Sequence, residues 1–121
     1  MKKILIVDDQ LDIRELVELT LKAEDCEILQ AQSGEEAVEV ARAEKPDLII
    51  MDIMMPGGVD GLEATSILKK DPKTRDCPII MLTSQGQEED VERGYEAGAD
   101  GYFIKPFSPL ELLNKIEEVL G

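Results

Sequence analysis

Histidine is missing from this sequence of 121 residues, and cysteine occurs only twice. The lack of histidine excludes the most common general base of enzymes, the Ser-His-Asp and Cys-His nucleophile systems, and most zinc sites. Cys26 and Cys77 lie far apart and form no C-x-x-C motif, so we interpret them as two reduced, packed thiols. The residue types that remain for chemistry are carboxylates, hydroxyls and lysines.

Basic residues and long hydrophobic runs are also scarce. The chain has 13 Lys and Arg against 27 Asp and Glu, a net charge of −14. Such an acidic surface repels phosphate backbones and anionic lipid, so we expect no direct binding of nucleic acid or membrane. No apolar run approaches the length of a membrane span, and the start MKKILIVDDQ has too few apolar residues for a signal peptide. These features predict a cytoplasmic protein.

The length suits one domain, residues 1–121, in which short apolar runs alternate with longer amphipathic segments. The apolar runs, which we expect to be strands, are at 4–7, 27–31, 47–51, 78–82 and 101–104. Five such strand–helix pairs predict an α/β fold: a doubly wound, flavodoxin-like, five-stranded parallel sheet in the order 2-1-3-4-5, with helices on both faces. The run at 27–31 is the most polar of the five, which suits an edge strand.

Three of the amphipathic segments begin with a capping box, in which a Ser or Asp precedes a Glu by three residues. The pairs are Ser33 with Glu36, Asp60 with Glu63, and Ser108 with Glu111. Two further helices are predicted over 12–25 and 87–100, and Gly98 is expected to end the second of them.

Polar side chains stand at the carboxyl ends of the expected strands. These residues are Asp8 and Asp9 after the first strand, Asp52 after the third, Thr83 and Ser84 after the fourth, and Lys105 after the fifth. In an open parallel sheet the ends of the central strands meet in one crevice at the switch point. Singly, such residues are caps, turn formers or solvated charges, but together they indicate a functional site.

The adjacent acids Asp8 and Asp9 need a counter-charge. Two carboxylates about 4 Å apart repel by about 4 kcal/mol at an effective dielectric of about 20, which corresponds to roughly three pKa units. Three carboxylates without nitrogen or sulfur ligands suit a hard divalent cation, Mg²⁺ or Mn²⁺. An acidic metal site beside a lysine also suits phosphoryl transfer, with a carboxylate as the nucleophile.

Four stretches, ILIVDDQ, LIIMDIMMPGGVDG, IIMLTSQG and GADGYFIKPFSP, resemble the receiver domain of two-component response regulators over essentially the whole chain. The resemblance implies a phospho-accepting signalling switch and not an enzyme, one that catalyses only its own phosphorylation and dephosphorylation. A sensor histidine kinase or a phosphotransfer protein would donate the phosphoryl group from a phosphohistidine. The surface over the fourth helix, fifth strand and fifth helix would then change, and would regulate a downstream protein or an output domain, or form a dimer.

The resemblance also implies roles for individual residues. Asp52 would accept the phosphoryl group. Asp9, Asp52 and the backbone carbonyl of Met54 would bind Mg²⁺ directly, while Asp8 would act mostly through water.

Lys105 and Thr83 would contact the phosphoryl oxygens, Ser84 would leave room for that group, and Tyr102 would turn inward as the aromatic switch. The Lys105–Pro106 peptide bond is expected to be cis. On the residues alone, Tyr102 would be interpreted as a half-buried strand aromatic. Two positions that tune the lifetime of the acyl phosphate in this family correspond to Met54 and Gln85.

One departure from the family pattern lies after Asp52, where MPGGVDG is one residue longer than usual. The glycine pair Gly57-Gly58 can absorb the extra residue in a turn. The departure leaves the acceptor assignment intact but affects the loop and the surface that faces the kinase.

Three alternative functions use the same fold or chemistry. A haloacid-dehalogenase-type phosphatase requires D-x-D, whereas Asp52-Ile53-Met54 lacks the second acid, and the chain is too short for a cap domain. A flavodoxin-like FMN carrier would have its phosphate repelled by Asp8 and Asp9. A receiver-like protein that is not phosphorylated would not need the phosphorylation residues, all of which are kept here.

Overall fold

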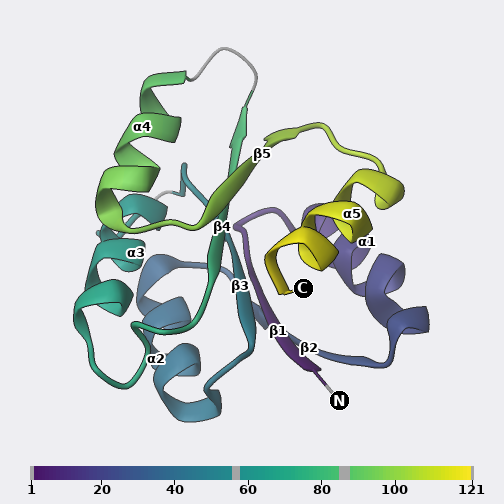
Figure 1. The fold of residues 1–121 in the computed structure, drawn as a ribbon, viewed down its shortest axis with the longest axis horizontal. Coiled ribbons are helices and arrows are strands. Elements are labelled where there is room, and N and C mark those ends of the chain that lie inside the picture. The colour runs from purple at the N-terminus through teal and green to yellow at the C-terminus, as the bar shows by residue number, and fades with distance from the viewer. Residues whose placement is uncertain (1, 56–57, 85–87, 121) are drawn as a thin grey trace.

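A computed structural model of the chain describes residues 2–55, 58–84 and 88–120. In these ranges five parallel strands alternate with five α-helices (Figure 1). The strands are β1 (Lys2–Val7), β2 (Cys26–Ala31), β3 (Leu48–Asp52), β4 (Ile79–Ser84) and β5 (Gly101–Lys105). The helices are α1 (Leu11–Leu21), α2 (Gly34–Glu44), α3 (Gly61–Lys70), α4 (Glu88–Ala97) and α5 (Pro109–Leu120), with a 3₁₀ turn η1 (Lys22–Glu24). The strand order β2-β1-β3-β4-β5 confirms the predicted doubly wound fold.

The sheet is covered on both faces, with α1 and α5 on one side and α2, α3 and α4 on the other (Figure 1). Side chains of a strand alternate between the two faces. On β1, Ile4 and Ile6 accordingly pack in the core under α1 and α5, while Leu5 and Val7 pack in the core under α2 and α3. The central strand β3 is buried at every position, which explains its unbroken apolar run. Strand β2 is a half-buried edge, as its polar sequence predicts.

The predicted helix starts are confirmed by their caps. The backbone N–H of Glu36 donates to Ser33 Oγ at 3.1 Å, that of Glu63 to Asp60 Oδ1 at 2.9 Å, and that of Glu111 to Ser108 Oγ at 3.2 Å. Gly98 ends α4 in the left-handed region, with φ 110°, where a side chain would be strained.

The first helix is shorter than predicted. Instead of continuing to residue 25, α1 ends at Leu21 and is followed by the tighter turn η1. Asp25 then takes a left-handed conformation, with φ 55°, and turns the chain into β2. An Asp tolerates this conformation better than most residues, and it ends the helical pattern before the expected boundary.

Candidate functional site

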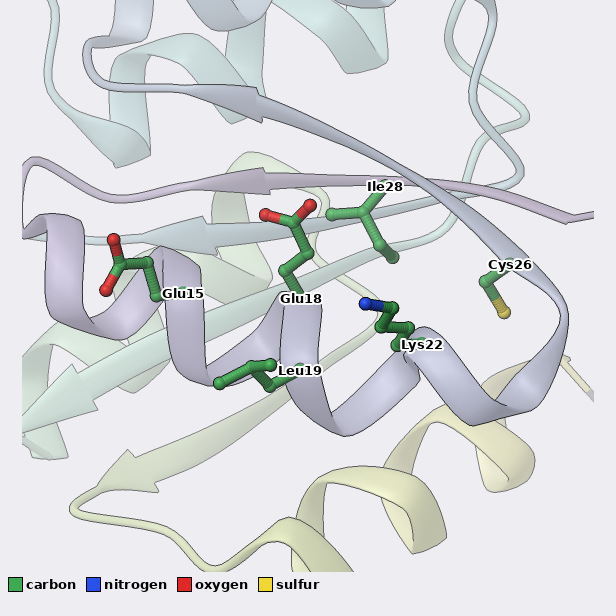
Figure 2. Close-up of a pocket in the computed structure, with 6 residues that line it drawn as sticks. All are labelled: Glu15, Glu18, Leu19, Lys22, Cys26 and Ile28. Carbon is green, nitrogen blue, oxygen red and sulfur yellow. The ribbon is translucent and has the colours of Figure 1, made fainter.

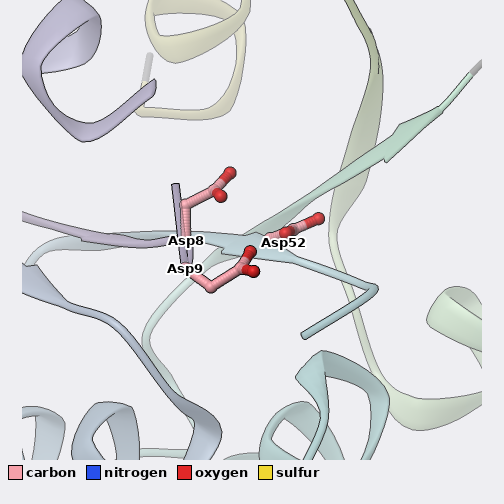
Figure 3. Close-up of side chains that lie close together, drawn as sticks. All are labelled: Asp8, Asp9 and Asp52. Carbon is pink, nitrogen blue, oxygen red and sulfur yellow. The ribbon is translucent and has the colours of Figure 1, made fainter. Parts of the chain in front are cut away.

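Asp8, Asp9 and Asp52 lie together at the carboxyl ends of β1 and β3 (Figure 3). Each can offer a carboxylate oxygen within 4.8 Å of the others. The two strands are hydrogen-bonded neighbours, with Val7 opposite Met51, so the residues that follow them are brought side by side. Asp8 and Asp52 are buried and Asp9 is exposed. The cluster is the one that the sequence predicted for a divalent cation.

Strand alternation places Asp8, Asp52 and Lys105 on the same face of the sheet. Each follows by two positions a core residue that packs under α1 and α5. Those core residues are Ile6, Ile50 and Phe103. These three charged side chains therefore form a polar end to the apolar face of the sheet that α1 and α5 cover.

Lys105 contacts Asp8 more closely than Asp52. Its Nζ lies 2.8 Å from Asp8 Oδ2 and 3.5 Å from Asp52 Oδ1. Burial acts to lower the pKa of the Lys105 ammonium, but its hydrogen bond to Asp8 and the charge of Asp52 outweigh that effect and raise the pKa. The lysine therefore stays charged, as a counter-ion that the fold itself supplies.

The Asp8 carboxylate is fully buried, with 0% exposure. Its Oδ1 accepts a hydrogen bond from the backbone N–H of Gln10 at 3.0 Å. Apart from the ion pair with Lys105, its Oδ2 receives no hydrogen bond from the described residues. A buried carboxylate oxygen in this situation depends on cations for its stabilisation.

The Asp52 carboxylate is held more loosely. Its Oδ1 accepts from the backbone N–H of Met54 at 3.4 Å, and its contact with Lys105 is also long. Burial, and then the negative charge of Asp8, raise the pKa of Asp52 from 3.8 to about 7, against the opposing charge of Lys105. An additional cation at this cluster would restore the carboxylate form of Asp52 at neutral pH.

The start of α3 supports the backbone of Asp52. The N–H of Gly61 donates to the carbonyl of Ile53 at 3.2 Å. A Cβ atom at Gly61 would collide with the carbonyl oxygen of Asp52, so only glycine allows the helix to approach this closely. Sequence analysis singled out the neighbouring cap Asp60 but missed this role of Gly61.

Thr83 and Tyr102 lie on the other face of the sheet, toward α4. Thr83 follows Met81 by two positions, and Met81 packs in the core under α2 and α3. Thr83 is buried, and its hydroxyl donates to the carbonyl of Ser84 at 3.5 Å. Tyr102 is 37% exposed, and its ring meets the ring of Tyr95 edge to face, with centroids 6.0 Å apart.

Three further sequence predictions concern positions near the site. The Lys105–Pro106 bond is cis, as predicted. The side chain of Met54 is exposed. Gln85, and the Pro56-Gly57 part of the longer loop, lie outside the described residues.

Sequence analysis also missed Arg14. Its Nη1 donates to the backbone carbonyl of Asp8 at 2.7 Å. The available signal was weak: Arg14 is the one basic residue in α1, among mostly acidic and apolar residues.

A separate hollow lies between α1 and β2 (Figure 2). It has a volume of about 350 Å³ and is lined by Glu15, Glu18, Leu19, Lys22, Cys26 and Ile28. None of the three clustered carboxylates lines it, so it does not belong to the acidic site. In the part of the chain that the structure describes, no helix is long and apolar enough to span a bilayer.

Comparison with protein families gives a match to the response regulator receiver domain over residues 4–117. Among curated proteins, the phosphate regulon transcriptional regulatory protein PhoB of Pseudomonas aeruginosa is 46% identical over 119 residues, which cover 98% of this chain and 52% of that protein. The transcriptional regulatory protein ResD of Bacillus subtilis is 42% identical over 118 residues, 98% of this chain and 48% of that protein. The chain thus spans about half the length of the curated relatives it matches.

Solved structures give the same match in three dimensions. The chemotaxis protein CheY4 of Vibrio cholerae superimposes with a TM-score of 0.92 at 36% identity, over 99% of each chain. The receiver domain of NtrX from Brucella abortus superimposes with a TM-score of 0.89 at 31% identity, over 97% of each chain.

Proposed function

The chain belongs to the receiver domains of two-component response regulators, the phospho-accepting switches of these signalling systems, and from that premise we propose that Asp52 is its phospho-acceptor. The observation that carries the assignment is that the carboxylates of Asp8 and Asp52 differ in how closely their neighbours contact them. Asp8 is fully buried and in close contact with Lys105, whereas the contacts of the Asp52 carboxylate with Met54 and Lys105 are long. Asp52 is therefore the buried acid that is free to attack a phosphorus atom.

The proposed reaction transfers a phosphoryl group from a phosphohistidine of a sensor kinase or phosphotransfer protein. An oxygen of Asp52 attacks in line, the P–N bond of the donor breaks, and a P–O bond to Asp52 forms. The carboxylates of Asp8, Asp9 and Asp52, with the backbone carbonyl of Met54, would hold Mg²⁺ or Mn²⁺, which neutralises charge on the phosphoryl oxygens when bound. Lys105 would contact the transferred group, and the same residues would support its later hydrolysis.

The switch would follow from the charge that Asp52 gains, about −1.5 to −2. Thr83 would be drawn to the phosphoryl group, and Tyr102 would leave its exposed position beside Tyr95 and turn inward. Because Tyr95 and Tyr102 lie on α4 and β5, this movement would change the surface formed by α4, β5 and α5. Met54 and Gln85 would tune the lifetime of the acyl phosphate. The named curated relatives are transcriptional regulators about twice as long as this chain, so an output domain or a separate downstream protein is the proposed recipient of the signal.

The test uses a small phosphodonor, acetyl phosphate, with Mg²⁺ and intact-protein mass spectrometry. The protein should gain one phosphoryl group that is lost on addition of hydroxylamine, as expected for an acyl phosphate. Asp52→Asn should abolish this label, whereas Asp12→Asn, which removes an exposed acid from the first turn of α1, should keep it. Unchanged labelling of the Asp52→Asn variant would exclude the assignment.

A further inference from the structure

The backbone N–H, the backbone carbonyl and the carboxylate of Asp8 each contact a neighbouring residue. Its backbone N–H donates to the carbonyl of Ala31 at 3.1 Å, and its carboxylate receives the contacts of Gln10 and Lys105 described above. Its backbone carbonyl accepts from Arg14 Nη1 at 2.7 Å. The proposed function uses the carboxylate of Asp8 but gives no reason for a charged donor on its carbonyl.

The Arg14 guanidinium is itself held in place. Its Nε donates to Gln30 Oε1 at 3.0 Å, and Gln30 Nε2 donates in turn to Glu18 Oε2 at 2.6 Å. Glu18 projects from α1 toward β2 in Figure 2. Since a guanidinium is planar and its donors have fixed directions, the bond to Gln30 on β2 orients the donor that reaches Asp8.

The carbonyl of Asp8 and the N–H of Asp9 belong to one rigid, planar peptide unit. A charge-assisted hydrogen bond on that carbonyl therefore restricts the rotation of the whole unit, and with it the direction in which the Asp9 side chain leaves the backbone. Asp9 is exposed, and among the described residues none donates a hydrogen bond to its carboxylate. Among the described residues, hydrogen bonds can therefore restrict its position through the backbone.

We propose that Arg14 is a positioning residue for the metal site: it holds the peptide between Asp8 and Asp9 so that the Asp9 carboxylate stays within reach of Asp52 for a divalent cation. The inference rests on the proposed function, because it concerns the same three carboxylates. It adds a residue from α1 that touches neither the metal nor the phosphoryl group.

The experiment measures the dissociation constant of Mg²⁺ by calorimetry for the unmodified protein and for Arg14→Met. Methionine keeps much of the aliphatic length of arginine but has no donor. Loss of a residue that orients a metal ligand typically weakens metal binding by about 10- to 100-fold, and we expect about 10-fold here because the contact is made through the backbone. At saturating Mg²⁺, the rate of labelling by acetyl phosphate should stay within about twofold of the unmodified protein, since the chemistry itself is unchanged.

The matched control is Arg42→Met. Arg42 Nε makes a charged hydrogen bond of 2.7 Å with Asp71, between the end of α2 and the end of α3. This variant should lose thermal stability without a change in Mg²⁺ affinity. An unchanged dissociation constant for Arg14→Met, or equal weakening in both variants, would overturn the proposal.

Arg14→Lys provides a rescue test, because lysine keeps a charged donor for the Asp8 carbonyl but not the fork to Gln30. It should recover part of the affinity, and binding as weak as that of Arg14→Met would count against the carbonyl contact. If Arg14→Met does not fold, Gln30→Ala replaces it; it should weaken Mg²⁺ binding less than the about 10-fold expected for Arg14→Met, and an unchanged dissociation constant is the contrary result. Failure of the proposed function would show differently, as labelling of Asp52→Asn or as no Mg²⁺ binding by the unmodified protein.

Discussion

Asp52→Asn should stabilise the metal-free protein, and increasingly so as the pH rises. Burial and the charge of Asp8 raise the pKa of Asp52 from 3.8 to about 7, so the folded state holds a proton over this interval that the unfolded state has released. Since Asp52 binds more protons in the folded state, its contribution to the free energy of unfolding falls with increasing pH between these two values and stays constant above them. Asp52 therefore lowers the free energy of unfolding slightly at acid pH and by its full amount above neutral pH.

The magnitude follows from the shift. One pKa unit corresponds to about 1.4 kcal/mol, so the shift of about three units is worth about 4 kcal/mol at pH 8 and about 1–2 kcal/mol at pH 5. The attraction between Asp52 and Lys105 is already included in this shifted pKa, so the asparagine variant carries no separate loss for it. We therefore expect the advantage of the variant to grow by about 2–3 kcal/mol from pH 5 to pH 8.

The assay is urea unfolding followed by circular dichroism, in the presence of EDTA, at half-unit pH steps. Asp12→Asn is the matched control, because it removes an exposed carboxylate and should show no growth with pH. With added Mg²⁺ the advantage of the variant at pH 8 should shrink, because a cation that binds the three carboxylates of the native state stabilises the unmodified protein more than the variant. An Asp52→Asn advantage that does not depend on pH would refute the argument that burial and Asp8 raise this pKa.

Three further predictions concern the lysine, the close helix approach and the aromatic pair. Lys105→Met leaves the buried Asp8 without its ion pair and should lower the free energy of unfolding in EDTA by about 3–5 kcal/mol; added Mg²⁺ should then raise the melting temperature more than in the unmodified protein, and an equal rise would contradict this. Gly61→Ala should cost about 1–3 kcal/mol in urea unfolding because its Cβ collides with the carbonyl of Asp52, whereas unchanged stability would mean that α3 shifts freely. In Tyr95→Leu the remaining tyrosine, in a chain without tryptophan, is Tyr102, so its fluorescence reports the switch directly; phosphorylation should reduce its quenching by acrylamide, and constant quenching would argue against an inward turn.

The fold could be predicted because two sequence signals agree: the apolar runs mark the strands, and the capping residues mark the starts of helices. The run ILIV at 4–7 is apolar at every position, as required when both faces of a strand are covered, and β1 is indeed buried from Ile4 to Val7. The capping residues Ser33, Asp60 and Ser108 then mark where helices begin. The end of α1 was predicted wrongly because Asp25 adopts a left-handed conformation, which the helical spacing of the preceding residues does not reveal.

The convergence of the site could also be predicted, since it depends on strand order alone. Asp8, Asp52 and Lys105 meet because their strand ends lie at one edge and because each lies two residues beyond a core residue on the same face. The sequence does not reveal which carboxylate Lys105 contacts most closely. In the structure its Nζ lies 2.8 Å from Asp8 Oδ2 and 3.5 Å from Asp52 Oδ1.

Contacts to backbone groups are the other part that sequence analysis missed. Arg14 donates to the backbone carbonyl of Asp8, and the backbone carbonyl of Asp52 leaves no room for a side chain at Gly61. Since every residue carries a carbonyl whatever its side chain, the sequence does not show which carbonyls make such contacts. Strand alternation also places Thr83 and Tyr102 on the face of the sheet toward α4, which the sequence analysis did not state.

The ion pair between Lys105 and Asp8 bears on how the proposed switch obtains its energy. A shift from 1:99 to 99:1 requires about 5.5 kcal/mol, and each new charge-assisted hydrogen bond to the phosphoryl group contributes about 1.5–3 kcal/mol. Lys105 contacts Asp8 at 2.8 Å, so in the phosphorylated state its charge would be shared between Asp8 and the phosphoryl group on Asp52. Such sharing would leave a fully buried carboxylate less well neutralised unless another cation assists. A divalent ion at the three acids would meet this need, so we expect the metal to be required for the conformational change as well as for phosphoryl transfer.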